Sequence, residues 1–222
     1  MKVTLKHFTP LEVCSMAIRT CWQSFDKSDD GGEKDLALID RVGNKNKHAS
    51  TLEHLYYNFY IQGISRACLQ ELARHRMASF SVKSSRYTLK EIKEEASFLP
   101  IDEANLARAE KYLVFTPNER VNIAAVQALE NLREILCANI HNDFAKYAMP
   151  ESYKTELHWS INARSLQNFL ELRTARAALW EIQKLAHCIY EALPPTHKYI
   201  FEEKITQPYE KNKDGNANPN DC

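Results

Sequence analysis

The strongest constraint on the fold is a change in the spacing of apolar residues along the chain. Over residues 54–62 apolar and polar side chains alternate, which places Leu55, Tyr57, Phe59 and Ile61 on one side. This period of two, together with the aromatic residues, predicts a half-buried β-strand. Most of the remaining apolar residues recur at steps of three and four, which is the spacing of one helix face.

The helical spacing predicts several helices, and turn residues mark where some of them begin or end. The expected helices cover residues 11–23, 33–42, 64–76, about 117–140, about 163–173 and 176–192. The run Thr116-Pro117-Asn118-Glu119 has a Thr suited to cap a helix, a Pro at the first helical position and a Glu three residues on. A second strand is expected at 153–161, after a short helix that Pro150 closes.

These patterns predict an α+β fold, a single helix-rich domain over residues 1–205 with a small, mainly antiparallel sheet packed against long helices. Residues 206–222 have too few apolar side chains to fold and are expected to form a disordered tail. No stretch reaches the roughly 18 to 20 apolar residues of a membrane span. The N-terminus lacks the apolar core of a signal peptide, so a cytoplasmic protein is expected.

The composition excludes several ways of binding nucleotides or metals. Lys plus Arg equals Asp plus Glu at 29 each, so the whole chain offers no basic excess for nucleic acid. None of the 5 glycines lies in a G-x-G-x-x-G or G-x-x-x-x-G-K pattern, so side chains would have to hold a phosphate. The six cysteines form no C-x-x-C pair, and His48, Glu53 and His54 do not follow a metal-site order, so no metal is expected.

One short region nevertheless concentrates positive charge. Residues 66–86 contain five basic side chains and one acidic side chain, a local charge of +4; these are Arg66, Arg74, Arg76, Lys83, Arg86 and Glu71. The region fits an anion-binding site, because guanidinium groups bind phosphate oxygens in a fork. It also fits a solvated basic helix end, since cations are favoured there. Spacing alone does not decide between the two.

The same region carries a motif that resembles one in the flavin-dependent thymidylate synthases. Arg74-His75-Arg76, seven further residues and Ser84 are similar to the R-H-R-x7-S motif of this family, and Ser84-Ser85-Arg86-Tyr87 continues it. Residues 48–54, HASTLEH, resemble the family's H-x-[ST]-x-x-E-H segment, and residues 162–173, NARSLQNFLELR, resemble its N-A-R-S-L-x-N-F-x-x-L-R segment. Three blocks in the right order cover residues 48–173, so this family is the leading interpretation.

The resemblance implies a homotetramer that methylates dUMP to dTMP. 5,10-Methylenetetrahydrofolate would give the carbon, NADPH would give the electrons, and FAD would carry hydride between them. Each active site would be built by more than one subunit, with the loop around Ser50 approaching a flavin bound mainly by a neighbour. No nucleic-acid or membrane partner is expected.

Matching positions imply two sets of ligand contacts and one catalytic residue. The FAD contacts would be Ser50, Arg74, His75, Arg76, Asn162, Ala163, Arg164 and Asn168. The dUMP contacts would be Glu71, Arg74, Val82, Lys83, Ser84, Ser85, Arg86, Lys146 and Arg173. Arg173 is the predicted catalytic residue, because a guanidinium beside the uracil would stabilise the negative charge that develops on N3 and O4 during the reaction.

Three of the dUMP positions differ from the family pattern. Lys146 stands where an arginine is common, which replaces a fork of donors with a point charge. Glu71 replaces a common glutamine and should face the sugar or the base rather than the phosphate. Val82 occupies a place that is often Glu or Gln, so only its backbone can contribute.

Some residues, and the chain as a whole, admit other roles. Ser84 could be a nucleophile, but without an adjacent base it is expected to donate a hydrogen bond to dUMP. His75 could be a general base or a helix-end residue, and Asn162 could cap the helix that follows it. The alternative function is a non-enzymatic nucleotide- or RNA-binding module built on residues 66–86. A nucleotide hydrolase would need a metal cluster or an activated nucleophile, and the sequence shows neither.

Overall fold

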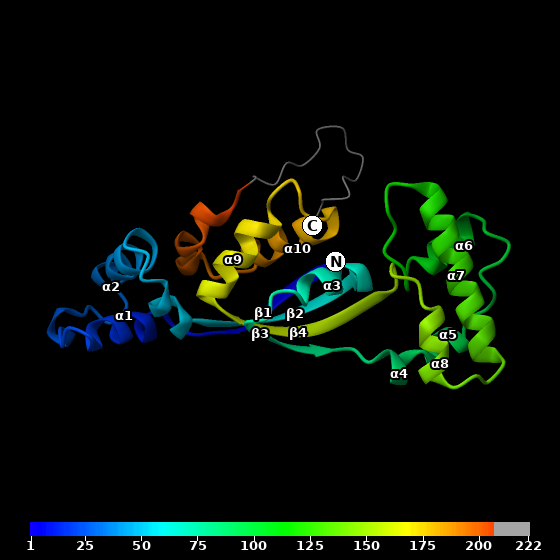
Figure 1. Cartoon of the computed structure of the whole chain (residues 1–222), viewed down its shortest axis with the longest axis horizontal. Coiled ribbons are helices and arrows are strands. Elements are labelled where there is room, and N and C mark those ends of the chain that lie inside the picture. Colours follow the sequence, from blue (N-terminus) through cyan, green and yellow to red (C-terminus); the bar gives the residue numbers. More distant parts are fainter. Residues whose placement is uncertain (207–222) are drawn as a thin grey trace. The chain divides into compact units, whose positions relative to one another are not determined.

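The computed structural model describes residues 1–206 as an α+β structure, which confirms the predicted fold class (Figure 1). The strands are β1 Lys2–Phe8, β2 Tyr56–Ser65, β3 Ala78–Val82 and β4 Lys154–Asn162. The α-helices of the described residues are α1 Leu11–Thr20, α2 Glu33–Ile39, α3 Arg66–Leu72, α4 Ser85–Thr88, α5 Lys90–Lys93, α6 Glu103–Ala109, α7 Glu119–Cys137, α8 Asn142–Ala145, α9 Ala163–Arg173 and α10 Trp180–Glu191. Apart from Thr206, the predicted tail lies outside the described residues.

The four strands form one antiparallel sheet in the order β1-β2-β4-β3. The alternation predicted for residues 54–62 is confirmed in β2, where Tyr57 and Phe59 are buried. The strand predicted at 153–161 is confirmed as β4, where Leu157 and Ile161 are buried. The sequence pattern does not predict β1 and β3, which form the two edges of the sheet. Side chains on these edge strands stay more exposed, and the alternation that identifies a strand is therefore weak.

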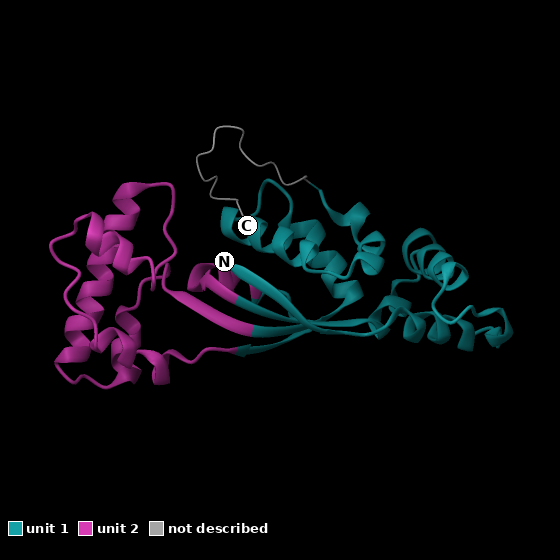
Figure 2. Cartoon of the chain, turned by 180° about the vertical axis from the view of Figure 1, so that it is seen from behind, with its two compact units in different colours: residues 1–61, 73–81, 158–222 teal, residues 62–72, 82–157 magenta. Residues whose placement is uncertain are grey.

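The chain divides into two compact units, which Figure 2 colours separately. Unit 1 comprises residues 1–61, 73–81 and the chain from residue 158 on. Unit 2 comprises residues 62–72 and 82–157. The prediction that residues 1–205 form a single domain stays a prediction.

An aromatic cluster forms the centre of unit 1, where α9 and α10 lie over one face of the sheet (Figure 1). The ring centroid of Trp159 lies 5.1 Å from that of Phe169 in α9 and 6.1 Å from that of Phe59 in β2. All three side chains are fully buried. Truncating one buried aromatic side chain to alanine typically costs about 3–5 kcal/mol, so this cluster fixes α9 firmly against the sheet.

Several predicted helix ends are wrong, and one of them shapes the site. Helix α7 is capped by Asn118, whose side chain accepts a hydrogen bond from the Val121 amide at 3.3 Å, rather than by Thr116. In the predicted helix 64–76, residues 64 and 65 instead extend β2, and α3 ends at Leu72. The basic run 74–76 therefore lies in a turn and not on a helix.

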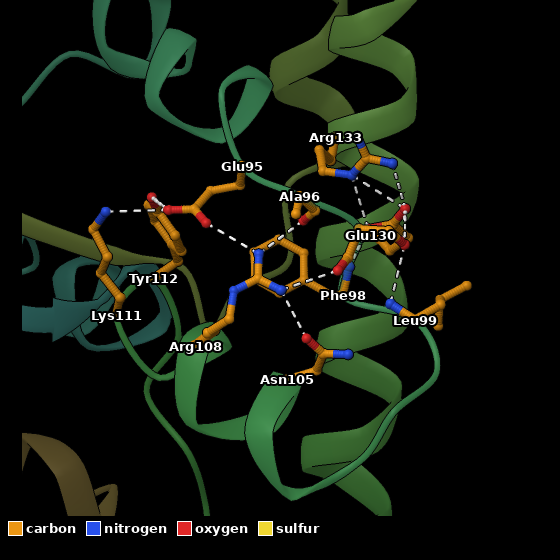
Figure 3. Close-up of polar contacts among 11 residues, drawn as sticks. Glu95, Ala96, Phe98, Leu99, Asn105, Arg108, Lys111, Tyr112, Glu130 and Arg133 are labelled. Atoms are coloured by element: carbon orange, nitrogen blue, oxygen red, sulfur yellow. Dashed lines mark hydrogen bonds and ion pairs between the residues drawn. The ribbon is translucent and has the colours of Figure 1, made fainter.

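Two buried or half-buried acidic side chains hold the helices of unit 2 together, and Figure 3 shows both. Glu130 of α7 pairs with Arg133 at 2.7 Å and accepts hydrogen bonds from the Ser97 hydroxyl at 3.0 Å and the Phe98 amide at 2.9 Å. These contacts tie the loop after α5 to the middle of α7. The hydrogen bonds from Arg133 are the main cause that lowers the pKa of Glu130 from its usual 4.5 to about 2.

Glu95 holds the other side of this loop. Its carboxylate accepts a hydrogen bond from the Tyr112 hydroxyl at 2.6 Å and pairs with Arg108 at 3.1 Å. The Arg108 guanidinium also lies 4.9 Å from the centroid of the Phe98 ring. The Tyr112 hydrogen bond, followed by that from Arg108, lowers the pKa of Glu95 to about 2.

Residues 1–206 contain neither a helix suited to cross a membrane nor a cluster of metal-binding side chains. None of the helices there combines the length and the apolar character needed to cross a bilayer. Within the same residues there is no group of three or more His, Cys, Asp or Glu side chains placed to hold a metal ion.

Candidate active site

One pocket of about 550 Å³ in unit 1 gathers seven of the predicted site residues. They are Arg74, His75, Arg76, Asn162, Arg164, Asn168 and Arg173. Four of the seven carry a guanidinium group, and the pocket lining includes one acid, Glu53, so the pocket attracts anions. Its volume falls in the range of about 300–1,000 Å³ that is typical of sites for small molecules and cofactors.

Helix α9 supplies one wall of this pocket. It begins after Asn162, whose side-chain oxygen accepts a hydrogen bond from the Ser165 amide at 2.8 Å, so the predicted capping role is confirmed. Arg164, Asn168 and Leu172 then follow at steps of four, which places them on one helix face. The cap and the helical spacing together align the polar side chains along the wall.

A hydrogen bond joins the turn after α3 to the end of α9. The Arg173 Nε–H donates to Nε2 of His75 at 2.9 Å. His75 therefore accepts this hydrogen bond through Nε2. His75 is buried, and the centroid of its ring lies 5.0 Å from that of Phe169 in an edge-on contact. The predicted catalytic arginine and a predicted flavin contact are thus in direct contact.

An ion pair brings a third segment to the pocket. Nη1 of Arg164 donates to the Glu53 carboxylate at 2.6 Å, and Glu53 belongs to the short 3-10 segment Ala49–His54. This segment lies close against Gly43, where an added Cβ would come within 2.8 Å of Cδ2 of Leu52. A larger residue at position 43 would force the Leu52 side chain to shift, so glycine favours this close packing of the segment.

The other predicted dUMP contacts lie in unit 2. Arg86 and Lys146 line a second pocket, of about 620 Å³. Ser84 directly precedes α4, and Ser85 is the first residue of that helix.

Five dUMP positions of unit 2 do not line this second pocket, namely Ser84, Ser85, Lys83, Val82 and Glu71. Nζ of Lys83 lies 3.8 Å from the Glu91 carboxylate and 4.0 Å from that of Glu156, so acids on two sides balance its charge. Val82 is the last residue of β3, and Glu71 is half-buried in α3.

Comparison with known proteins identifies the family. The profile of the family described as "Thymidylate synthase complementing protein" matches residues 4–197. The flavin-dependent thymidylate synthase of Wolinella succinogenes is 68% identical over 201 residues, which is 90% of this chain and 97% of the relative. That of Helicobacter pylori is 65% identical over 204 residues, 91% of this chain and 98% of the relative. The chain belongs to the flavin-dependent thymidylate synthases.

Solved structures agree with this assignment. A crystal structure of thymidylate synthase X (ThyX) from Helicobacter pylori, described as holding FAD and dUMP, superposes with a TM-score of 0.91 at 63% identity and covers 93% of this chain and 100% of that one. A second structure of the same protein, also described as a complex with FAD and dUMP, gives 0.90 at 64% identity, covering 92% and 100%. The predicted family and enzyme activity are confirmed, and the alternative of a non-enzymatic RNA-binding module is set aside.

Two predicted flavin contacts do not line the unit 1 pocket. Ser50 is exposed in the segment Ala49–His54. Ala163 is fully buried, and its amide donates a hydrogen bond to the Leu55 carbonyl at 2.8 Å, so its methyl group belongs to the core. Ala163 therefore serves the start of α9.

Four pocket residues are absent from the predicted set, and two kinds of signal could have found them. Glu53, Met77, Ser165 and Leu172 line the pocket. Leu172 continues the face that Arg164 and Asn168 begin, and Glu53 is the acid of the H-x-[ST]-x-x-E-H segment. Met77 follows the basic run and is 73% exposed, which adds an apolar surface to a polar pocket.

Proposed function

We propose that this flavin-dependent thymidylate synthase, which methylates dUMP to dTMP, binds FAD in the unit 1 pocket. The observation that carries the proposal is the convergence of four arginines and two asparagines in one pocket of a chain without a glycine-rich phosphate loop. A dinucleotide needs donors for its pyrophosphate and for the edges of its rings, and these side chains provide both. The description of the Helicobacter pylori structures as FAD and dUMP complexes supports it.

Within this pocket the side chains divide by chemistry. Arg74, Arg76 and Arg164 would bind the pyrophosphate, because a guanidinium offers two parallel N–H donors. Asn162 and Asn168 would bind the polar edges of the flavin or the adenine, since an amide both donates and accepts. FAD supplies the hydride transfer when bound.

Residues of the predicted dUMP set would hold this substrate. Ser84, Ser85 and Arg86 offer donors to its phosphate, together with backbone groups of Val82 and Lys83. Lys146 adds a positive charge without a fork. Glu71 would face the sugar or the base, and Arg74 is a further proposed dUMP contact.

Arg173 would act on the reacting ring. Its fixed positive charge would stabilise negative charge on N3 and O4 of the uracil when C6 is attacked or C5 becomes nucleophilic. The hydrogen bond from Nε to His75 holds the guanidinium in place before the substrate arrives.

The remaining parts of the proposal follow from family membership. 5,10-Methylenetetrahydrofolate would be the carbon donor and NADPH the reductant. The chain would assemble as a homotetramer in which the segment containing Ser50 reaches the flavin of another subunit. A cytoplasmic location stays a prediction from the N-terminal sequence.

Replacing Ser84 with alanine tests the proposed dUMP site. We expect about a 10-fold weaker affinity for dUMP with some activity retained, because one hydroxyl donor to a charged phosphate is lost while the arginine remains. The measurement is dTMP formation from dUMP, methylenetetrahydrofolate and NADPH by the FAD-loaded enzyme, with dUMP varied. A variant with normal dUMP affinity and no turnover would instead make Ser84 a nucleophile.

A further inference from the structure

The contact between Arg86 and Asp143 has a particular geometry. Nε of Arg86 donates to Oδ1 of Asp143 at 2.5 Å, and Nη2 donates to Oδ2 at 3.1 Å. The carboxylate thus binds the guanidinium from the side, along the Nε and Nη2 edge. The two side chains are 52% and 41% exposed, and both line the second pocket with Lys146.

Backbone contacts fix both partners of this pair. The side-chain amide of Asn142 donates to the backbone carbonyl of Arg86 at 2.7 Å. The backbone amide of Asp143 donates to Nδ1 of His141 at 3.2 Å. The start of α4 and the start of α8 are therefore joined at two points. One is the contact of the Asn142 side chain with the Arg86 carbonyl, and the other is the Arg86–Asp143 ion pair.

The side-on pair leaves the outer edge of the guanidinium, formed by Nη1 and the second proton of Nη2, for another ligand. Within residues 1–206 no hydrogen bond from Nη1 is found. Two parallel N–H donors on one edge match two oxygens of a phosphate. An ion pair this exposed adds little to folding stability, so its geometry is better explained by the orientation it gives Arg86.

We propose that Asp143 is a positioning residue that holds Arg86 side-on, so that the outer edge of the guanidinium meets the phosphate of the nucleotide substrate. This inference rests on the proposed role of Arg86 in binding dUMP. An arginine side chain loses considerable rotamer freedom when it is ordered, and Asp143 orders it before the substrate binds. The dUMP affinity gained by ordering Arg86 therefore exceeds the affinity lost through repulsion between the Asp143 carboxylate and the phosphate.

Whether removal of the Asp143 carboxylate weakens or tightens dUMP binding distinguishes a positioning role from a purely electrostatic one. Removing a negative charge beside a phosphate site would by itself tighten the binding of an anion. If Asp143 instead positions Arg86, its removal weakens the binding of dUMP. The variants Asp143→Ala and Asp143→Asn remove the charge, whereas Asp143→Glu keeps a carboxylate that can still bind side-on.

The test measures KM for dUMP and kcat with the FAD-loaded enzyme. We expect Asp143→Ala to raise KM about 10-fold with kcat within about 2-fold, Asp143→Asn to fall between it and the wild type, and Asp143→Glu to restore part of the loss. Glu134→Gln removes one charge from an exposed position of α7 and should leave KM unchanged. An unchanged or lowered KM in Asp143→Ala overturns the proposal.

Arg86→Ala separates this inference from the proposed function. If Asp143 acts through Arg86, adding Asp143→Ala to Arg86→Ala causes no further rise in KM. If Asp143→Ala raises KM equally in both backgrounds, Asp143 does not act through Arg86 and the positioning role is wrong. If Arg86→Ala itself leaves KM for dUMP unchanged, the proposed phosphate site is wrong as well.

Discussion

Replacing Arg173 with alanine is expected to lower dTMP formation by about 10³-fold while FAD stays bound. A fixed cation at a developing negative charge is worth roughly 10²–10³-fold or more in rate. Alanine would also leave His75 without the donor that lies 2.9 Å from its Nε2. The proposed pyrophosphate ligands Arg74, Arg76 and Arg164 remain in this variant. The measurements are turnover at saturating substrates and the flavin content of the purified variant.

Two controls make this result specific. Arg173→Lys keeps the charge but loses the planar fork, so it should recover only part of the rate. Arg176→Ala removes an exposed arginine three residues further on that does not line the pocket, and it should retain wild-type turnover. Wild-type turnover in Arg173→Ala would show that the catalytic charge lies elsewhere.

Replacing Glu130 with alanine is expected to destabilise the protein by about 3–5 kcal/mol, the typical cost of removing one partner of a buried ion pair. The side chains of Glu130 and Arg133 are only 2% and 17% exposed, and the change would leave Arg133 and the Phe98 amide without their acceptor. Urea unfolding followed by circular dichroism measures the loss. Glu134→Gln, at an exposed position of the same helix, should change the free energy of unfolding by no more than about 0.5 kcal/mol.

The same carboxylates give the pH dependence of this stabilisation. The pKa values of Glu130 and Glu95 are lowered from 4.5 to about 2 in the folded protein. A lowered pKa in the folded state stabilises the protein above the unfolded value, and this stabilisation is lost as the pH falls through the folded value. Wild type should therefore lose stability as the pH falls from 4.5 towards 2. Glu130→Ala should lose less over the same range, and an equal loss in both proteins would contradict the assignment to Glu130.

The interior of the sheet could be predicted from the sequence, whereas its edges could not. Tyr57 and Phe59 face the core and Asn58 does not, so β2 shows the alternation of a strand buried on one face. Strand β3, with its serines at the sheet edge, buries too little to show it. Helix α9 was predictable to the residue, because Asn162 supplies a cap and the apolar positions recur at helical spacing.

The site could be predicted in its parts but not in its contacts. The family motifs located Arg74, His75 and Arg173, and the structure places all three around one pocket. The hydrogen bond between His75 and Arg173 joins residues 98 positions apart, and the Glu53–Arg164 pair joins residues 111 positions apart. Such contacts depend on how β2, β4 and α9 assemble, which no local pattern of residues determines.

The most direct measurement of the central claim is the visible absorption spectrum of the purified protein after incubation with FAD and removal of unbound cofactor, before and after dUMP is added. We predict that flavin remains bound at about one per subunit. We also predict that dUMP perturbs its spectrum, because in the proposed site the flavin lies where the nucleotide reaches it. A protein that retains no flavin, or whose bound flavin does not respond to saturating dUMP, would contradict the claim.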